Sequence, residues 1–376
     1  MWPFRRREPE TRAAYQNGFA GMALTGSRTA NVQLAENLGT VTACVNAIGS
    51  VMGSLPPLVF RSGDGGRMEL PSHPVARMIR NPWSMMTWPD WIEWAMGSVL
   101  LHGNALAEIV HDGAGRVTGL RPIPWQSVAP VLLGSGRLAF DVSSYPQPRR
   151  RLLDTEVFYL KDRSDDGLVG RSRISRAPDV VGNAVSLQDF AGNAWENQAT
   201  PSGAIEIASS LTQPQFDRVT AAFDRRHTGV GNARRVLVLD NDAKWKPLSV
   251  SPEDAEVLGS RRFSVEELCR LFQVPPPIVQ DYTHNTFTNS AQASLWFAQF
   301  SLAPWCRKIE AEFARSVFNA NDGTHLEIDL SGLMRGDFET RWKAWEIAVK
   351  NDILDRNEVR DIEGWGPRAV TAGARI

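Results

Sequence analysis

Cysteine is scarce in this sequence, and long apolar runs are missing. Three cysteines, Cys44, Cys269 and Cys306, lie far apart in a chain of 376 residues, which argues against a disulfide framework and is typical of a reducing compartment. No apolar stretch reaches the roughly 18 residues that a membrane-spanning helix needs, and the basic N-terminus MWPFRRREPE is not followed by an apolar run of signal-peptide length. We therefore expect a soluble cytoplasmic protein without membrane contact, in which the cysteines are small apolar core residues.

An excess of charge of either sign is also missing. The 41 Lys and Arg residues almost balance the 42 Asp and Glu residues, which leaves a formal net charge of -1. A tight binder of nucleic acid carries a strong positive field over its surface, and this chain as a whole does not. Any contact with nucleic acid is therefore expected to be local or weak. The hydrophobic share of 43%, together with the length, predicts a sizeable core divided among two or three domains.

The common catalytic and metal-binding motifs are absent. The sequence contains no GxxxxGK[ST] phosphate loop, HExxH zinc helix, paired CxxC or GxSxG nucleophile elbow, and its histidines show no metal-ligand spacing. We therefore expect no enzymatic activity and no metal or cofactor. Adjacent carboxylates at Asp165 and Asp166 keep one alternative open, a metal-dependent nuclease or hydrolase. An Asx-type turn before Gly167 is the simpler interpretation of this pair, and we favour it.

The residues that are present predict an α+β fold. The segment VTACVNAIGSVM has apolar residues at helical spacing, and LPPLVFRS predicts a strand entered through prolines. A second helix is expected over TWPDWIEWAMGSVLLHGN, because Thr87 and Asp90 form a capping-box pair and Gly103 supplies a C-terminal stop. The segment ALAEIVHDGAGRVTGLRPI predicts a hairpin that turns at residues 112–115, and EVFYLK predicts a further strand.

The middle of the chain is expected to place a small strand-and-helix unit between two helices. The first helix is predicted from Ile174 to about Gln198. A strand GAIEIA, a helix after Thr212 and a strand pair formed by RRVLVLD and KWKPLSV are expected next. The second flanking helix is predicted from Ser251, with a proline in its first turn, to about Gln273.

The stretch VPPPIVQDYTHNTFTNSAQ begins with prolines that end a helix and continues as a polar loop. Three consecutive prolines end the preceding helix, because proline cannot donate a backbone hydrogen bond and disfavours helix in the residue before it. Apolar residues at helical spacing then predict one long helix from about Asn289 to Phe318, bent at Pro304. The remaining elements expected are a strand after Gly323, a helix containing Trp342 and Trp345, and a short helix near Asn357.

Six segments in collinear order over roughly residues 35–365 carry a family resemblance. They are HPVARMIRNPW, LLHGNALAEIVHDGAGRV, SDDGLVGRSRI, NQATPSGAI, KWKPLSVSPEDAEVLGSRRFSVEELCRLFQVPPPIV and NDILDRNEVRDIEG. Each segment alone is only moderately specific. In this order they resemble the portal proteins of tailed double-stranded-DNA phages, in the siphophage-type family that is also found in phage-like gene transfer agents.

The resemblance implies a structural ring, usually a dodecamer, at one vertex of a capsid. Such a ring conducts double-stranded DNA during packaging and ejection and connects head to tail. The implied partners are further copies of the chain, the DNA, an ATP-driven terminase motor, a head–tail adaptor and the major capsid protein. The implied location is a virion or phage-like particle assembled in the bacterial cytoplasm. The copy number, the origin of the packaged DNA and the adaptor's identity stay open.

The resemblance also divides the chain into the parts of a portal subunit, with an α/β wing, a helical stem, a small α/β clip and a long spine helix. The parts are a flexible N-terminal arm (1–30), the first part of the wing (31–173), stem helix one (174–200), the clip (201–250), stem helix two (251–274), the tunnel loop (275–289), the long wing helix (290–320) and a C-terminal wing with a short crown (321–376).

Part of the implied tunnel loop is expected to face the channel. A loop that lines a channel must touch DNA without holding it, and uncharged side chains bond phosphate with less grip than Lys or Arg. An ordinary interhelical loop packed against a neighbouring copy is the alternative. The candidate residues are Tyr282, Thr283, His284, Asn285, Thr286, Phe287, Thr288 and Asn289.

Mostly basic residues of the implied clip are candidates for contacts with a partner or another copy. Arg225 and Arg226 lie in the last turn of the expected clip helix, where cations also suit the helix dipole, so both roles stay open. The full candidate set is Arg225, Arg226, Arg234, Arg235, Lys244, Trp245 and Lys246. A monomeric or dimeric binding module is a further alternative, which a ring-sized particle would exclude.

Overall fold

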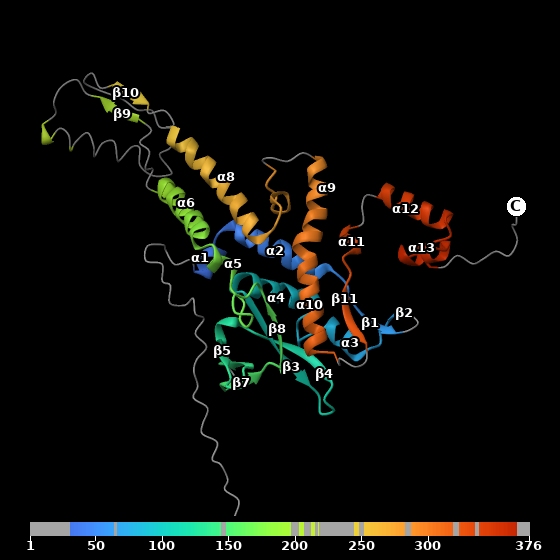
Figure 1. Cartoon of the computed structure of the whole chain (residues 1–376). Helices are drawn as coiled ribbons and strands as arrows, with labels where there is room; N and C mark the ends of the chain where they lie inside the picture. Colours follow the sequence, from blue (N-terminus) through green and yellow to red (C-terminus); the bar gives the residue numbers. More distant parts are fainter. Residues whose placement is uncertain are drawn as a thin grey trace, which may run out of the picture. The chain divides into compact units, whose positions relative to one another are not determined.

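Two units make up the chain, Met1–Pro178 with Leu268–Ile376, and Asp179–Glu267. The structure is a computed structural model. It describes residues 31–366 except 64–65, 144–147, 197–202, 207–211, 215–216, 218–243, 248–251, 283–286, 319–322 and 335–337. The expected N-terminal arm lies outside the described residues. Figure 1 shows the elements of both units in sequence colours.

Two long helices form the centre of the first unit. Helix α2 (Gly39–Ser54) follows the short α1 (Val32–Glu36), and α4 (Trp88–His102) follows α3 (Pro74–Arg80). Every apolar position that the sequence placed on the inner face of α2 or α4 is buried. The capping box of Thr87 with Asp90 is present, and Gly103 ends α4 at a φ of 82°, where glycine is favoured. The predicted boundaries of α4 are therefore confirmed.

The three cysteines are buried and are not joined by disulfide bonds, as expected of small core residues. Burial raises the pKa of Cys306 to about 12. A hydrogen bond with Cys269, together with burial, raises the pKa of the Cys44 thiol well above its usual range. Both thiols are therefore protonated at neutral pH, which makes them poor nucleophiles.

The first sheet joins distant parts of the chain in the order β11–β1–β2. Strand β1 (Pro57–Gly63) pairs antiparallel with β2 (Gly66–Glu69) and with β11 (Thr324–Ile328). The sequence predicted β1 and β11 separately. Their pairing, which places Val59 opposite Leu326, depends on tertiary folding and has no local signal.

The second sheet has the order β4–β3–β8. Strands β3 (Asn104–His111) and β4 (Val117–Ile123) form the predicted hairpin, and β8 (Val157–Lys161) pairs with the other side of β3. At the hairpin turn the Asp112 carboxylate accepts hydrogen bonds from the backbone N–H groups of Ala114 and Arg116. These bonds explain why the DGAG sequence turns the chain here.

A third sheet, in the order β5–β6–β7, was not predicted. Its strands are β5 (Val128–Leu132), which follows the 3-10 helix η1 (Trp125–Ser127), β6 (Leu138–Val142) and β7 (Arg150–Leu153). The sheet packs onto the second one through a cluster of buried side chains that includes Leu106, Phe140 and Val157. Short strands separated by polar turns give a weak periodic signal, so this sheet is specified by packing.

The long helix expected from about Asn289 to Phe318 is divided into three consecutive helical segments. They are α9 (Phe287–Trp296), the π-helical segment η4 (Phe297–Leu302) and α10 (Ala303–Ser316). Figure 1 labels the first and the last of them, α9 and α10, in orange. Pro304 lies in the first turn of α10 and cannot donate to the carbonyl four residues earlier. The predicted irregularity is therefore present, but it takes the form of a π-helical segment that precedes the proline.

Helix α10 ties the first two sheets together through two glutamates. Glu312 accepts a hydrogen bond from the backbone N–H of Tyr159 in β8 at 2.7 Å, and Glu310 accepts one from Ile328 in β11 at 2.9 Å. Their side chains are only 11% and 12% exposed. Each glutamate thus satisfies a strand N–H that burial would otherwise leave unbonded, which fixes the helix against both strands.

The expected stem helix from Ile174 to about Gln198 is interrupted. Helix α5 (Arg173–Arg176) ends at Ala177, whose φ of -129° and ψ of 59° are not helical, and α6 (Pro178–Glu196) begins directly afterwards. Proline disfavours helical geometry in the residue before it, which accounts for the break at Ala177. Helix α8 (Pro252–Phe272), which runs from the second unit into the first, matches the predicted second helix closely.

The strands described in the second unit are β9 (Gly203–Glu206) and β10 (Lys244–Pro247), which pair antiparallel. The sequence had paired KWKPLSV with RRVLVLD, which lies outside the described residues. Most of the expected clip helix also lies outside them.

In the described part of the chain after β11 there are three helices. They are α11 (Ser331–Met334), α12 (Phe338–Lys350) and α13 (Arg356–Ile362). The expected short helix near Asn357 is confirmed, with a capping box formed by Asp355 and Glu358. An ion pair of 3.0 Å between Arg341 and Glu363 connects α12 with the end of α13. Within the part of the chain that the structure describes, no helix has both the length and the apolar character to cross a bilayer.

Candidate functional site

The loop between β8 and α5, residues 162–172, carries the SDDGLVGRS motif and is anchored by Asn104. The Asn104 amide accepts a hydrogen bond from the backbone N–H of Gly170 at 2.8 Å and donates one to the Gly170 carbonyl at 2.8 Å. A Cβ atom at Gly170 would lie 2.1 Å from the Gly103 carbonyl oxygen. Only glycine permits this backbone approach, so the motif's second glycine is needed to dock the loop.

The two aspartates of this loop are engaged in structural contacts. Asp166 accepts hydrogen bonds from the backbone N–H groups of Leu168 at 2.7 Å and Val169 at 2.9 Å, which is an Asx-type turn as predicted. Asp165 forms ion pairs with Arg176 at 2.8 Å and Arg171 at 3.2 Å. The hydrogen bond from Arg176 keeps the pKa of Asp165 below its ordinary value.

These contacts engage both carboxylates on which the nuclease alternative depends. In the described ranges, no group of three or more His, Cys, Asp and Glu side chains is placed to hold a metal ion. The arginines around Asp165 already neutralise it, whereas a catalytic metal needs several free oxygen ligands in one place. The DD pair therefore shapes the loop that leads into α5.

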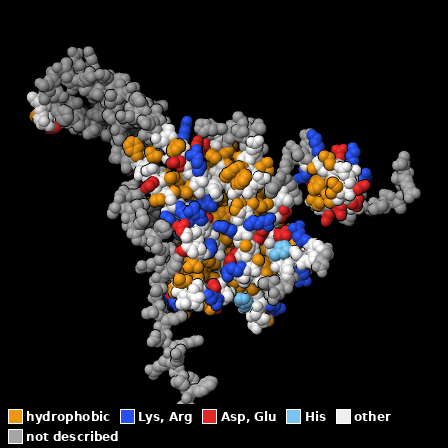
Figure 2. Space-filling view, viewed as in Figure 1, with side chains coloured by type: hydrophobic (Ala, Val, Ile, Leu, Met, Phe, Trp, Pro, Cys, Tyr) orange, Lys and Arg blue, Asp and Glu red, His pale blue; other side chains and the backbone are white. Residues whose placement is uncertain are grey.

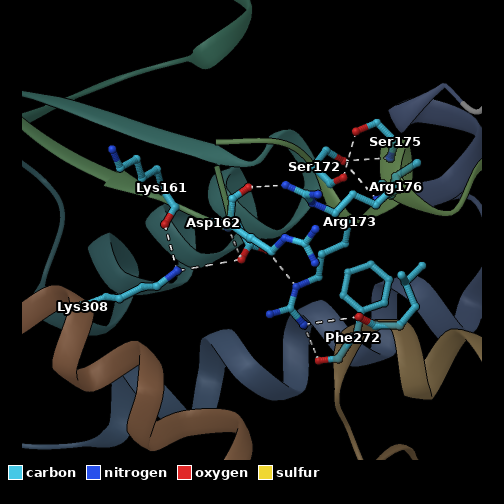
Figure 3. Close-up of polar contacts among 11 residues, drawn as sticks. Lys161, Asp162, Ser172, Arg173, Ser175, Arg176, Phe272 and Lys308 are labelled. Carbon is cyan, nitrogen blue, oxygen red and sulfur yellow. Dashed lines mark hydrogen bonds and ion pairs between the residues drawn. The ribbon is translucent and has the colours of Figure 1, made fainter. Parts of the chain in front are cut away.

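Arg173, the first residue of α5, caps the end of α8. Its guanidinium donates to the Phe272 carbonyl at 2.7 Å and to the Asp162 carboxylate at 2.9 Å (Figure 3). The Arg173 and Asp162 side chains are only 12% and 10% exposed. A cation at a helix C-terminus bonds carbonyls that lack intrahelical partners and interacts favourably with the helix dipole.

The end of α8 explains why such a cap is required. Gln273 takes the left-handed conformation with a φ of 58°, and the N–H of Val274 bonds the Cys269 carbonyl at 2.9 Å. This is a Schellman-type ending in which glutamine occupies the position usually taken by glycine, at some cost in backbone energy. Arg173 and the Ser301 hydroxyl, which donates to the Gln273 carbonyl, stabilise this ending.

Lys308 of α10 also contacts the Asp162 carboxylate, from the other side. Its ammonium donates to the Lys161 carbonyl at 3.1 Å and lies 3.9 Å from Asp162, as Figure 3 shows. Burial lowers the pKa of Lys308 despite the nearby carboxylate. We refer to Asp162, Arg173 and Lys308 as the junction cluster. It connects β8, α5, the end of α8 and α10 within the first unit, beside both points where the chain passes to the second unit.

After the junction cluster, the chain continues through a rigid turn at the three consecutive prolines, residues 275–277. Pro276–Val279 is the 3-10 helix η3, closed by Gln280 in the left-handed conformation at a φ of 66°. The N–H of Asp281 bonds the Pro276 carbonyl at 3.0 Å. Because proline fixes its own backbone angle, this turn sets the direction in which the following residues leave.

The predicted channel residues are only partly described. Tyr282 is 61% exposed, and Thr283, His284, Asn285 and Thr286 lie outside the described residues. The remaining three, Phe287, Thr288 and Asn289, form the first turn of α9, so their placement in the loop is corrected. Thr and Asn have low helix propensity, which is why the sequence put the helix start too late.

The clip candidates are described only in part. Arg225, Arg226, Arg234 and Arg235 lie outside the described residues. Lys244, Trp245 and Lys246 lie on β10, opposite Glu206, Ile205 and Ala204 of β9. Among the described residues of the second unit, the three residues therefore lie on a strand that pairs with β9. Sequence reasoning did not find the junction cluster, because Arg173 and Phe272 are far apart in the chain.

With this geometry in place, comparison with known proteins assigns the family. The model of the phage portal protein family matches residues 39–364. The chain therefore belongs to the phage portal protein family, as the sequence resemblance indicated, and its α+β fold is that of portal proteins.

The individual relatives cover most of this chain. It is 29% identical over 353 residues to the portal protein of Enterobacteria phage HK97, covering 91% of this chain and 82% of the phage protein. It is 27% identical over 360 residues to the probable portal protein of Streptomyces phage phiC31, covering 92% and 79%. A chain from the neck of a native gene transfer agent particle, computed with C12 symmetry, has the same fold, with a TM-score of 0.64, 21% identity and coverage of 93% and 98%.

Proposed function

We propose that this chain is the subunit of a portal ring that conducts double-stranded DNA at a capsid vertex and connects head to tail. The match to the portal family over residues 39–364 carries this proposal. The similarity in fold to a chain of a neck with C12 symmetry supports a closed ring of identical subunits, in which each copy presents one surface to the next. The ring is a structural part of a virion or phage-like particle, and the ATP-driven motor is a separate terminase.

The same proposal assigns the parts of the chain. The first unit contains the wing, the tunnel loop and a short crown, and α6 and α8 are the two stem helices around a clip that contains β9 and β10. The head–tail adaptor and the terminase dock on the clip, with Lys244 and Lys246 in the contact region, and the major capsid protein surrounds the wing. The order of the elements supports this division, because α6 and most of α8 lie at the two ends of the inserted unit Asp179–Glu267, on either side of β9 and β10.

The tunnel loop between η3 and α9 is proposed to contact DNA in the channel. Residues 282–286, YTHNT, contain no Lys, Arg, Asp or Glu, which limits the sequence-independent grip on phosphate. The rigid proline turn and the capped end of α8 hold the start of this loop in one direction. His284→Lys with Asn285→Lys is expected to slow DNA movement in assembled particles. Unchanged rates of packaging and release would contradict the channel assignment.

Imaging of the purified full chain tests the ring directly. Native mass spectrometry and negative-stain microscopy over a range of concentrations are expected to show a closed ring with a central hole. A chain that remains monomeric at every concentration, both alone and with the major capsid protein, would overturn the proposal. A stable dimer without a hole would favour a binding module instead.

A further inference from the structure

The outer side of α9 and of the π-helical segment η4 has an unusual composition. The segment from Phe287 to Leu302, FTNSAQASLWFAQFSL, contains no Lys, Arg, Asp or Glu. Phe297 and Leu302 are buried against the core of the first unit, whereas Leu295, Trp296 and Phe300 are 38%, 43% and 55% exposed. A helix that faces water on one side normally carries charged residues there.

The exposed aromatic side chains form one surface. The ring centroids of Trp296 and Phe300 lie 5.3 Å apart at an interplanar angle of 41°, which is within the range of favourable aromatic pairs. Figure 2 shows hydrophobic side chains gathered in the region where Figure 1 places α9. We refer to Leu295, Trp296 and Phe300 as the aromatic patch. Such patches, free of charge and rich in Trp and Phe, are typical of the core of a protein–protein interface.

Helix α10, which continues the same helical run, shows what a water-facing surface looks like in this chain. Arg307 is 81% exposed, whereas Lys308 and Arg315, each 44% exposed, also donate to the strand carbonyls of Lys161 and Val157. The carboxylates of Glu310 and Glu312 point to strand N–H groups instead. The change from charge to aromatic residues occurs at the π-helical segment, so the two halves have different surroundings.

Double-stranded DNA does not fit the aromatic patch. Contact with a duplex is dominated by phosphate, which is bound by Lys, Arg and polar donors. The patch offers apolar area and no positive charge. A protein surface is the better match, because burial of exposed apolar area is then the main favourable term.

We propose that the aromatic patch is buried against the neighbouring copy of this chain in the ring. This inference rests on the proposed function, since it names the partner of one surface of the portal subunit. The occupant is a second copy because the fold matches that of a chain in a neck with C12 symmetry. In a cyclic ring every subunit meets two neighbours through two different surfaces. The aromatic patch is one of these two surfaces, and it contacts a different surface of the next copy.

Charge placed in the patch is expected to prevent the contact. Trp296→Glu and Phe300→Glu would each bury an unpaired carboxylate, so the protein concentration at which half of the chains are in rings is expected to rise at least about tenfold. Met85→Glu is the matched control, because Met85 is 94% exposed and lies outside the patch. Circular dichroism of each variant checks that the monomer is folded. Normal assembly of both folded patch variants would overturn the inference.

Hydroxyl-radical footprinting of the wild-type chain separates this inference from the proposed function. Oxidation of Trp296 is expected to be much slower in assembled rings than in dilute monomer, whereas oxidation of Met85 is unchanged. If rings form and Trp296 is oxidised equally in both states, the aromatic patch is not the subunit contact and the ring itself stands. Protection that occurs only when the major capsid protein is added would assign the patch to that partner and overturn the inference. A wild-type chain that forms no ring contradicts both proposals.

Discussion

Helix α10 and the stretch formed by α9 and the π-helical segment are consecutive parts of one helical run, yet their outer faces are opposite in character. The outer face of α10 displays Arg307, whereas that of the preceding stretch displays Trp296 and Phe300. Both stretches bury apolar residues on their inner faces. The difference therefore lies in what each outer face meets. We attribute the charged outer face of α10 to contact with water, and the aromatic outer face of the preceding stretch to contact with a neighbouring copy.

The comparison also separates stability from assembly. Contacts on the inner side of α10, including Glu312, Glu310 and Lys308, hold the sheets of the first unit together and connect them with the junction cluster. The aromatic patch makes a small contribution to the fold of one subunit and a large one to the ring. Substitutions in the two groups should therefore affect different measurements.

The largest expected effect is at the carboxylate shared by two cations. Asp162→Ala leaves Arg173, whose side chain is only 12% exposed, without its carboxylate and near Lys308, so we expect the free energy of unfolding to fall by about 3 kcal/mol. Asp162→Asn, which keeps the shape and an acceptor for Arg173, should lose less. Urea unfolding followed by tryptophan fluorescence measures both. Equal unfolding midpoints for wild type and Asp162→Ala would show that the junction cluster does not support the fold.

The second-largest effect on stability is expected when an inward-facing carboxylate of α10 is removed. Glu312→Ala leaves the Tyr159 N–H without its acceptor and removes the partner of Arg315, which should cost about 2 kcal/mol of the free energy of unfolding. Glu312→Gln restores an acceptor and is expected to recover part of the loss. Thermal melting at low protein concentration, where no ring forms, gives the comparison. Identical melting of the Ala and Gln variants would argue against the hydrogen bond as the cause.

Charge changes on the two outer faces should have unequal effects on the ring. Leu295→Glu lies at the less exposed edge of the aromatic patch. It is expected to raise several-fold the protein concentration at which half of the chains are in rings, because the contact would remove the new carboxylate from water. Arg307→Glu on α10 should change it by less than about twofold, since exposed ion pairs are weak. Sedimentation velocity of both variants provides the measurement. An equal effect of the two substitutions would remove the distinction between the faces.

A smaller effect should appear in the pH dependence of stability. Burial lowers the pKa of Lys308 in the folded chain, so the unfolded chain binds more protons at this residue as the pH approaches the ordinary value of 10.5. Its contribution to stability therefore rises with pH in that window. Lys308→Met should show a smaller rise between neutral and alkaline pH than wild type in urea titrations. An equal rise of stability with pH in wild type and Lys308→Met would contradict burial of Lys308 as the cause of its lowered pKa.

The smallest effect is expected for the exposed pair on α10. Arg307→Ala removes an ion pair of 2.8 Å with Glu310, in which Arg307 is 81% exposed. Such pairs contribute less than about 1 kcal/mol, so melting should barely change. A large loss of stability would show that Arg307 has a role in the fold that its exposure does not indicate.

Elements with local signals were predictable from the sequence. The capping box and the terminal glycine set both ends of α4, and the DGAG turn sets the hairpin of β3 and β4. Likewise Pro252 and the triple proline delimit α8. In each case a side chain or a proline acts on backbone atoms a few residues away, and such effects are visible in one sequence.

Contacts between distant residues were not predictable. Nothing near Arg173 indicates that it caps a helix ending at Phe272, and nothing near β1 indicates that it pairs with β11. Pro304 signalled an irregularity, but its π-helical form depends on packing, including the bond from Ser301 to Gln273. The aromatic patch could not be separated from core residues, because exposure is a property of the folded chain.

A cryo-electron microscopy map of the assembled ring tests the central claim most directly. The account predicts that Trp296 and Phe300 of each copy are in van der Waals contact with a different surface of the adjacent copy, while Arg307 faces solvent. A map in which Trp296 and Phe300 line the open channel, or contact only residues of their own chain, would contradict it.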